Sequence, residues 1–410
     1  MDTNEKAQLL RFKIENFRSF GHEQEILFSD DGKKTRKITA IVGLNATGKS
    51  NIFRALLTLQ NMIKSSANAD FVLPYDYFRF TKGYDEKPTG FELQFRVGDS
   101  FFSYTIRYNS ELVLFESLKE KRIGSYRQRT IFERDHNVVN PGAINFGFNR
   151  ALMSRTRPNT LLITKAIENN NSYAIAVYTA INSFHVLSCA NGQLEGEAIM
   201  TLKKHPELVN ETIEILKKAD FTIQSIRFDD VMMPNELLDK LNIPEETKAI
   251  MRSNPGTMVS TGHLLKDDFY NPIKTNGMET YVGINIGEES IGTRALLGVI
   301  VPIIQSIKDN KILFIDEFGA YLHYGLVQRI IDSYKSNTFA PGLIVCTHAG
   351  MMLNRIDRDS IFILEKNLKN EESIIHKLSE SGARLDENFS NGYYSNSRYK
   401  FLEHKNGKLF

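Results

Sequence analysis

The chain has 410 residues, of which 41% are hydrophobic and 24% are charged, and its formal net charge is +2. This length predicts two or three domains, and the composition is that of an ordinary soluble chain rather than a disordered or membrane one. A charge so close to zero gives no argument by itself for binding to nucleic acid.

The cysteine content and the N-terminal residues favour a cytoplasmic location. Cys189 and Cys346 are the two cysteines, which argues against a disulfide framework and favours a reducing, cytoplasmic setting. Residues 1–12 are polar and lack the basic and then apolar pattern of a signal peptide. We expect no contact with a membrane, because no apolar run approaches the roughly 18 residues that span a bilayer.

Residues 40–53, AIVGLNATGKSNIF, contain a phosphate-binding motif. The segment from Gly43 to Ser50 satisfies G-x-x-x-x-G-K-[ST], which is the P-loop pattern. The apolar run KITAIVG precedes it, and NIFRALLTLQNMI follows with apolar residues at helical spacing. A strand, a loop and a helix therefore come in the order that places phosphates at a helix N-terminus.

Each residue type in this motif has its own role. Gly43 and Gly48 let the backbone turn so that N–H groups point at phosphate oxygens. Lys49 supplies a positive charge for the β- and γ-phosphates, and Ser50 offers a hydroxyl ligand to Mg²⁺. The predicted nucleotide-binding residues here are Gly43, Asn45, Ala46, Thr47, Gly48, Lys49, Ser50 and Asn51.

The middle of the chain predicts a change from strands to helices. Residues 91–134 alternate apolar and polar positions, which predicts antiparallel strands. Residues 150–220 are mostly helical in pattern, and a strand and a polar helical stretch follow up to about residue 252. No heptad repeat persists, so a long coiled-coil arm is not expected.

Basic residues gather at 33–37 and at 119–129. A solvated face is the favoured interpretation of both clusters. The alternative is a set of phosphate contacts along a nucleic-acid strand.

Three segments in the last third of the chain contain residues that could act together with the P-loop. The run NIGEESIGTRALLG places acidic residues and Ser290 before an apolar helix, which is also ordinary N-cap chemistry. The strand KILFI ends in Asp316 and Glu317, a pair that suits Mg²⁺ coordination by the aspartate and polarisation of a water by the glutamate. The strand GLIVCT is followed by His348, which we expect at the carboxyl edge of a parallel sheet, within reach of a γ-phosphate.

The order of these segments resembles the ATP-binding-cassette class of ATPases, in its SMC-like and OLD-like branch. The opening LLRFKIENFRSFGHEQEILF strengthens this match. The segments GLNATGKSNIFRAL, EESIGTRALLG, DEFGAYLH and CTHAGMMLNRIDRDSIFILEK and the tail GYYSNSRY together resemble the abortive-infection (Rlo-type) ATPases, including the ATPase subunit of PARIS-type anti-phage systems. This resemblance implies an α/β fold with a P-loop core, an antiparallel β subdomain and an inserted helical subdomain. It also implies ATP and Mg²⁺ as ligands.

The resemblance further implies roles for individual residues. Ser290, Gly292 and Thr293 are the signature that contacts the γ-phosphate held by the P-loop of a second copy. Asp316 is a metal ligand together with Ser50, and Glu317 and His348 are the catalytic residues. The sequence departs from the pattern of the class at two places. The signature reads E-E-S-I-G-T rather than the transporter-type L-S-G-G-Q, and the segment PYDYFRF contains no glutamine that could serve as the Q-loop residue.

We expect four parts in the chain. Residues 1–90 form the first part of the core, 91–148 a β-rich lobe, 149–262 a helical insertion, and 263–410 the second part of the core. Only 44 residues follow Lys366, too few for the Toprim nuclease domain of OLD-type proteins.

Two functions follow from the resemblance. One is a regulatory ATPase that forms an ATP-sandwiched homodimer or higher oligomer and controls a separately encoded effector in response to a phage protein. The alternative is an SMC-like clamp that binds DNA in repair.

Overall fold

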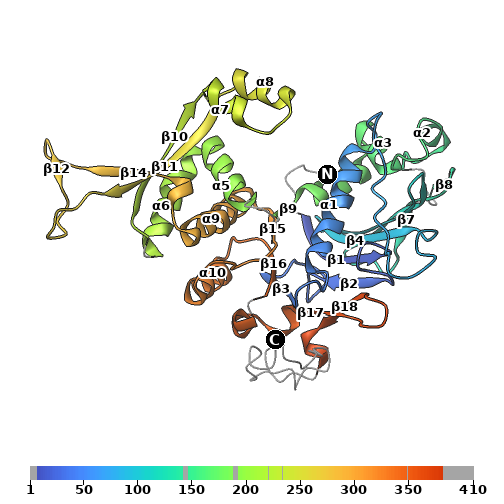
Figure 1. Cartoon of the computed structure of the whole chain (residues 1–410). Helices are drawn as coiled ribbons and strands as arrows, with labels where there is room; N and C mark the ends of the chain where they lie inside the picture. The colour runs from blue at the N-terminus through green and yellow to red at the C-terminus, as the bar shows by residue number, and fades with distance from the viewer. Residues whose placement is uncertain are drawn as a thin grey trace. The chain divides into compact units, whose positions relative to one another are not determined.

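A computed structural model describes residues 7–141, 146–187, 193–219, 221–232, 234–348 and 350–381 (Figure 1). The chain divides into two compact units. Unit 1 contains Met1–Cys189, Ser306–Ala320 and Val327–Phe410, and unit 2 contains Ala190–Gln305 and Tyr321–Leu326. The predicted boundaries differ from this division, because the residues between 149 and 189 belong with the core and those between 263 and 305 do not.

The core of unit 1 is a six-stranded sheet. Its strands lie in the order β18-β17-β3-β16-β15-β9, and all neighbouring pairs are parallel except β17 with β18. The bounds are β3 Ile38–Gly43, β9 Phe184–Leu187, β15 Ile312–Ile315, β16 Leu343–Thr347, β17 Ile361–Lys366 and β18 Ser373–Lys377. β3, β15 and β16 are buried along their whole length, as expected for strands covered on both faces.

Strand β9 lies within residues 150–220, whose pattern predicts helices. The four residues FHVL pair in parallel with β15, from Phe184↔Ile312 to Leu187↔Ile315. Such a short apolar run has no helical or strand periodicity of its own, so only its neighbour in the sheet determines its conformation.

A seven-stranded antiparallel sheet forms the second layer of unit 1. The order is β2-β1-β4-β5-β6-β7-β8, which confirms the antiparallel strands predicted for residues 91–134 and adds the N-terminal hairpin to them. The bounds are β1 Ala7–Glu15, β2 Gln24–Leu27, β4 Thr89–Val97, β5 Ser100–Tyr108, β6 Val113–Arg122, β7 Arg129–Asp135 and β8 Val138–Pro141.

Helices complete unit 1. Helix α1, Lys49–Ser65, buries an apolar stripe that includes Ile52, Phe53 and Leu56. The ring of Phe314 on β15 packs edge-on against Phe53 and Phe28, at 5.3 and 5.6 Å between centroids. The other helical segments are α2 Arg150–Ser154, α3 Leu162–Glu168, α4 Ser172–Asn182, α10 Tyr324–Ser336, η4 Gly350–Arg355, η5 Arg358–Ser360 and η6 Leu378–Ser381.

Unit 2 combines helices with a three-stranded sheet, so the inserted region is not helical alone. The sheet order is β10-β11-β14, with a separate two-stranded hairpin β12-β13. The elements are α5 Gln193–Lys204, η2 Pro206–Leu208, α6 Val209–Lys218, β10 Ile223–Val231, α7 Asn235–Lys240, α8 Glu245–Ser253, β11 Gly256–Leu264, β12 Lys274–Thr275, β13 Met278–Glu279, β14 Tyr281–Asn285, η3 Ile286–Glu288 and α9 Ile291–Asp309.

Helix α9 is the apolar helix predicted after Ser290, and it has 19 residues. Among the described residues it is the one helix that by length and composition could cross a membrane, with a mean hydropathy of 1.4 over its most apolar window. In the structure 61% of that window is buried, as in the core helix of a folded domain. It is therefore weak evidence for a membrane span.

The two basic clusters have different structural roles. In the first, Arg36 is buried and donates from Nε to Asp30 at 2.6 Å, and Lys37 Nζ donates to the carbonyl oxygens of Asn337 and Thr338 at 2.8 and 3.1 Å. These side chains hold the fold together. In the second, Arg122 and Arg129 lie within ion-pair distance of the buried Glu120, whereas Tyr126 between β6 and β7 is 100% exposed.

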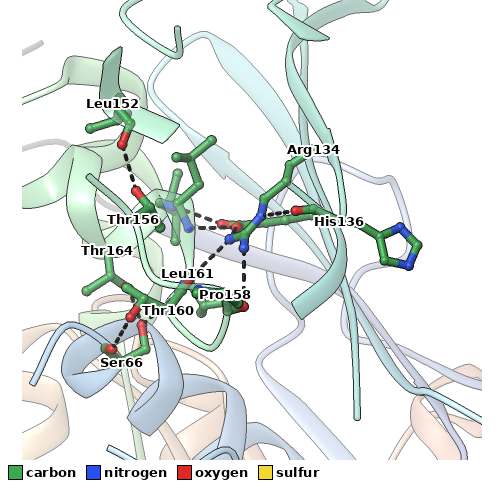
Figure 2. A network of polar contacts seen from close by, with 12 residues as sticks. Ser66, Arg134, His136, Leu152, Thr156, Pro158, Thr160, Leu161 and Thr164 are labelled. Carbon is green, nitrogen blue, oxygen red and sulfur yellow. Dashed lines mark hydrogen bonds and ion pairs between the residues drawn. The ribbon is translucent and has the colours of Figure 1, made fainter. Parts of the chain in front are cut away.

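A buried polar network joins the far end of α1 to the antiparallel sheet (Figure 2). Arg134 on β7 donates to the carbonyl oxygens of Thr160, Pro158 and His136, at 2.7, 3.2 and 2.8 Å. Thr160 Oγ1 in turn donates to the carbonyl of Ser66, the C-cap of α1, at 2.8 Å. Because loop carbonyls buried without partners are costly, this arginine fixes the segment that follows α2.

Glu116 on β6 completes the network. Its carboxylate accepts from the backbone N–H of Leu162 and Ile163 at 2.6 and 2.9 Å, at the start of α3, and lies 3.5 Å from Arg134. Burial raises the pKa of Glu116 above its ordinary value, and the charge of Arg134 opposes this shift. Both side chains are fully buried, so each depends on the other for its charge.

The change Arg134→Met should destabilise the protein by about 3–5 kcal/mol, because it leaves the Glu116 carboxylate buried without its cation. Urea unfolding followed by circular dichroism measures the loss. The matched control is Arg107→Met, which removes an arginine whose side chain is half exposed and 3.6 Å from Glu15; its cost should stay below about 1 kcal/mol. Equal costs for the two variants would contradict a buried ion pair at Arg134.

Candidate functional site

The parallel sheet brings three distant segments to one edge. β16 lies between β3 and β15, with Thr347 opposite Val42 and Ile315 opposite Val345. Because parallel strands point the same way, the residues after β3, β16 and β15 come together at their carboxyl ends. These residues are the loop 43–50, His348 and the pair Asp316 and Glu317. The expectation that the GLIVCT strand runs parallel to the other two is confirmed.

The loop between β3 and α1 has the backbone that the P-loop pattern requires. Ala46 and Gly48 have φ values of 62° and 95°, in the left-handed region that favours glycine. A Cβ at Gly43 would lie 2.6 Å from the carbonyl oxygen of Leu364 and 2.7 Å from Thr47 Oγ1, so the loop passes too close for any side chain there. Asn45 is exposed, whereas Thr47 is buried and donates to the carbonyl of Leu44 at 2.9 Å.

Two serines far apart in sequence support this loop. Ser373 Oγ on β18 donates to the carbonyl of Thr47 at 2.7 Å, and Ser373 N donates to the carbonyl of Ser19 at 2.7 Å. Asn51 Nδ2 donates to Ser19 Oγ at 2.8 Å, so in this structure Asn51 fixes α1 to the loop after β1. The sequence analysis missed both serines. The Asn-Phe-Arg-Ser run was noticed only as a family opening, and Ser373 has no local signal at all.

Lys49 is buried beneath the loop. Its Nζ donates to the carbonyl oxygens of Gly43 and Leu44, both at 2.8 Å, and lies 3.3 Å from Nδ1 of His348. Burial lowers the pKa of Lys49 to about 8, against the raising effect of Cys346, Asp316 and Glu317. A lysine held at the loop by two carbonyls can turn to phosphate oxygens, which would favour its charged form.

The Asp-Glu pair lies on a strained turn directly after β15. Asp316 is buried, and its Oδ1 accepts from the N–H of Glu317 at 3.1 Å. Glu317 has a φ of 51°, which a glutamate adopts only at a free-energy cost, and its side chain is exposed. The next residue, Phe318, donates its N–H to the carbonyl of Cys346 at 2.8 Å and accepts from Thr347 Oγ1 at 2.9 Å. Strand β16 therefore holds the turn in place.

His348 is exposed at the end of β16. Although His348 is exposed overall, its partial desolvation and the charge of Lys49 lower its pKa from the ordinary value. The neutral ring can therefore accept a hydrogen bond from Lys49 or donate one to a phosphate oxygen from its other nitrogen.

The signature residues belong to unit 2 and form the start of α9. Ser290 Oγ accepts from the N–H of Thr293 at 3.1 Å and lies 2.8 Å from Thr293 Oγ1, so Ser290 caps this helix. Thr293 is buried, whereas Ser290 is exposed and Gly292 is half-buried. In the structure, Ser290 therefore has the ordinary role of an N-cap, and the N-terminus of α9 is exposed.

The residues of unit 1 fit a nucleotide with Mg²⁺. Gly48 begins the 17-residue helix α1, and among the described residues no side chain caps this end and no acidic residue lies in its first turn. The first N–H groups of a helix have no partner within it, and they favour an anion. Lys49 lies at the same loop, and Ser50 and the buried Asp316 offer the oxygen ligands that Mg²⁺ prefers.

The change Lys49→Ala should abolish ATP binding, because no other cation of the loop can replace the buried ammonium group. Isothermal titration with Mg²⁺ and a non-hydrolysable ATP analogue measures the affinity. The control Lys64→Ala removes a lysine from the opposite end of α1 and should leave the affinity within about twofold. An unchanged affinity in Lys49→Ala would contradict the phosphate-cradle assignment.

Three solved SMC heads are similar to the chain at low identity. An SMC head bound to the C-winged helix domain of ScpA is 15% identical, with 90% of this chain and 97% of that chain covered and a TM-score of 0.42. The SMC head domain from Thermotoga maritima is 14% identical, with 90% and 98% covered and a TM-score of 0.38. An Smc head with an extended coiled coil, bound to the C-terminal domain of ScpA from Pyrococcus furiosus, is 13% identical, with 92% and 98% covered and a TM-score of 0.38.

Comparison with curated proteins finds no match. Residues 38–349 match the protein family described as "AAA domain, putative AbiEii toxin, Type IV TA system". The matched residues cover more than half of the chain and include the P-loop, the Asp-Glu pair and His348. The chain therefore belongs to this family of AAA-domain ATPases.

Proposed function

We propose that the protein binds and hydrolyses ATP with Mg²⁺, and that ATP closes two copies of the chain around two nucleotides. The observation that carries the proposal is the meeting of Lys49, Asp316, Glu317 and His348 at one edge of the parallel sheet. Lys49 and the N-terminus of α1 hold the phosphates, and Ser50 and Asp316 would hold Mg²⁺, which would supply positive charge to the phosphates.

The hydrolytic step uses the exposed carboxylate of Glu317. A water oxygen attacks the γ-phosphorus while Glu317 accepts its proton, and the bond between phosphorus and the β–γ bridging oxygen breaks to give ADP and phosphate. The strained turn holds Glu317 beside the buried Asp316, so the base and the metal ligand keep a fixed spacing. His348 orients the γ-phosphate through the ring nitrogen that does not face Lys49.

The second copy contributes the start of α9. The exposed Ser290 and the N-terminal N–H groups of this helix present hydrogen-bond donors to a γ-phosphate held by another chain. ATP has a higher affinity for the paired form than for the single chain, so ATP favours pairing. Hydrolysis then lets the two copies separate.

The paired form would control a separately encoded effector in an anti-phage system, with a phage protein as the trigger. Two points support this assignment: the family description names a putative toxin of a type IV toxin–antitoxin system, and the motif order resembles abortive-infection ATPases. Native mass spectrometry of Glu317→Gln, co-expressed with its neighbouring genes, tests it. An ATP-dependent assembly that contains a neighbour-encoded protein supports the proposal, whereas an ATP-dependent homodimer alone contradicts it.

The alternative is a DNA-binding clamp, and one observation favours it. The β6–β7 hairpin exposes Tyr126 fully, together with Lys121 and Arg127, for which the described residues offer no carboxylate within ion-pair distance. Contacts to several phosphates would make DNA binding fall steeply with salt. Fluorescence anisotropy with a labelled duplex across a salt series distinguishes the two functions.

The change Glu317→Gln should slow hydrolysis at least about a hundredfold, as expected for the loss of a general base. Binding of ATP should persist, because the amide keeps the size of the side chain and Lys49 is untouched. Single-turnover hydrolysis with radiolabelled ATP measures the rate. Wild-type turnover would remove Glu317 from the role of base.

The change Ser290→Arg should prevent ATP-driven pairing, because the arginine fills the surface that meets the second nucleotide. Each isolated chain should still bind ATP through its own P-loop. Analytical ultracentrifugation with adenylyl imidodiphosphate measures pairing, and titration calorimetry measures binding. Normal pairing in this variant would refute a signature contact between copies.

A further inference from the structure

The two adjacent glutamates before the signature serine have different environments. Glu288 is exposed, in keeping with an ordinary acidic residue near a helix start. Glu289 turns onto strand β11 instead, where its Oε1 accepts a hydrogen bond from Thr261 Oγ1 and lies 2.7 Å from Nε2 of His263. The side chains of His263 and Glu289 are 20% and 10% exposed, so water screens this contact little.

His263 is itself held on its other side. Its Nδ1 lies 3.0 Å from Thr222 Oγ1, just before β10. One tautomer satisfies both contacts, in which Nε2–H donates to the Glu289 carboxylate and Nδ1 accepts from the Thr222 hydroxyl. The ring is therefore fixed between β10 and the segment that precedes α9.

The segment 285–289, which precedes Ser290, is also attached to β11 at its first residue. β14 pairs with β11 from Leu264↔Tyr281 to Ser260↔Asn285, and Asn285 Oδ1 accepts from the N–H of Gly287 at 2.9 Å. Three residues, Ile286–Glu288, form the short η3 helix before Glu289. This segment is therefore attached to β11 at both ends, by the β-ladder at Asn285 and by the carboxylate of Glu289.

We propose that Glu289 and His263 are positioning residues that hold the signature loop in the conformation that receives the nucleotide of a second copy. Neither needs to touch the nucleotide. A loop fixed before pairing loses less conformational entropy when the two copies close, so pairing is tighter for the same contacts. This inference rests on the proposed contact between the signature and the second nucleotide, and it adds a residue, His263, that lies outside the sequence motif.

Pairing and nucleotide binding must be measured separately. In Glu289→Ala and His263→Ala, pairing with adenylyl imidodiphosphate should weaken about tenfold or more, because the loop loses a charge-assisted hydrogen bond. The affinity of the isolated chain for the analogue should stay within about twofold, since the P-loop is untouched. Because the P-loop belongs to unit 1 and this contact to unit 2, unfolding of unit 2 would also weaken pairing alone, so the fold of each variant is measured as well.

Two further variants sharpen the test. Glu289→Gln keeps an oxygen that accepts from Thr261 and His263, so pairing should stay within about threefold of wild type. His205→Ala is the matched control, because His205 lies 3.1 Å from Glu207 in another ion pair of unit 2 whose side chains are 44% and 63% exposed; it should pair normally. Circular dichroism of each variant shows that unit 2 remains folded.

The outcomes distinguish this inference from the function on which it rests. If Ser290→Arg loses pairing but Glu289→Ala and His263→Ala pair like wild type, the positioning role is wrong and the proposed function stands. If Ser290→Arg also pairs normally, the signature contact fails and the positioning role with it. Loss of pairing in Glu289→Gln equal to that in Glu289→Ala would overturn the role of the carboxylate as a hydrogen-bond acceptor.

Discussion

The register of the parallel core sheet is the constraint on which the site depends. β16 lies between β3 and β15, so the end of β3 meets the ends of two strands that follow it by more than 250 residues. A shift of one residue in either pairing would invert the faces of the buried strands and move the loop 43–50 away from Asp316. Because β3, β15 and β16 are buried on both faces, close packing of their side chains, rather than an apolar–polar alternation, opposes such a shift.

Polar contacts fix the helix that follows this edge at both ends. At its start, Ser19 and Ser373 hold the loop and Asn51. At its end, Arg157 donates to the carbonyl oxygens of Ala69, Ser66 and Ala67, at 2.7, 3.2 and 3.1 Å. Such contacts leave little freedom for α1 to move apart from the antiparallel sheet, which preorganises the phosphate site.

The sequence was sufficient to predict the strands, the loop and the helix of the P-loop, because local periodicity and a fixed glycine spacing encode them. It was also sufficient for the antiparallel strands of residues 91–134 and for the place of His348 after a parallel strand. It failed where the information is not local. FHVL becomes a strand only beside β15, and the supports Ser19, Ser373 and His263 are defined by contacts across tens to hundreds of residues.

Unit 1 contains the proposed phosphate site and the catalytic Glu317, and unit 2 contains an exposed helix start that is proposed to meet the nucleotide of a second copy. The central claim is that the edge formed by β3, β16 and β15 holds the nucleotide. A structure determined with Mg²⁺ and adenylyl imidodiphosphate tests it most directly. The account predicts a triphosphate along residues 43–50 with Ser50 and Asp316 at the metal. A nucleotide bound elsewhere, or none bound at millimolar concentration, would contradict it.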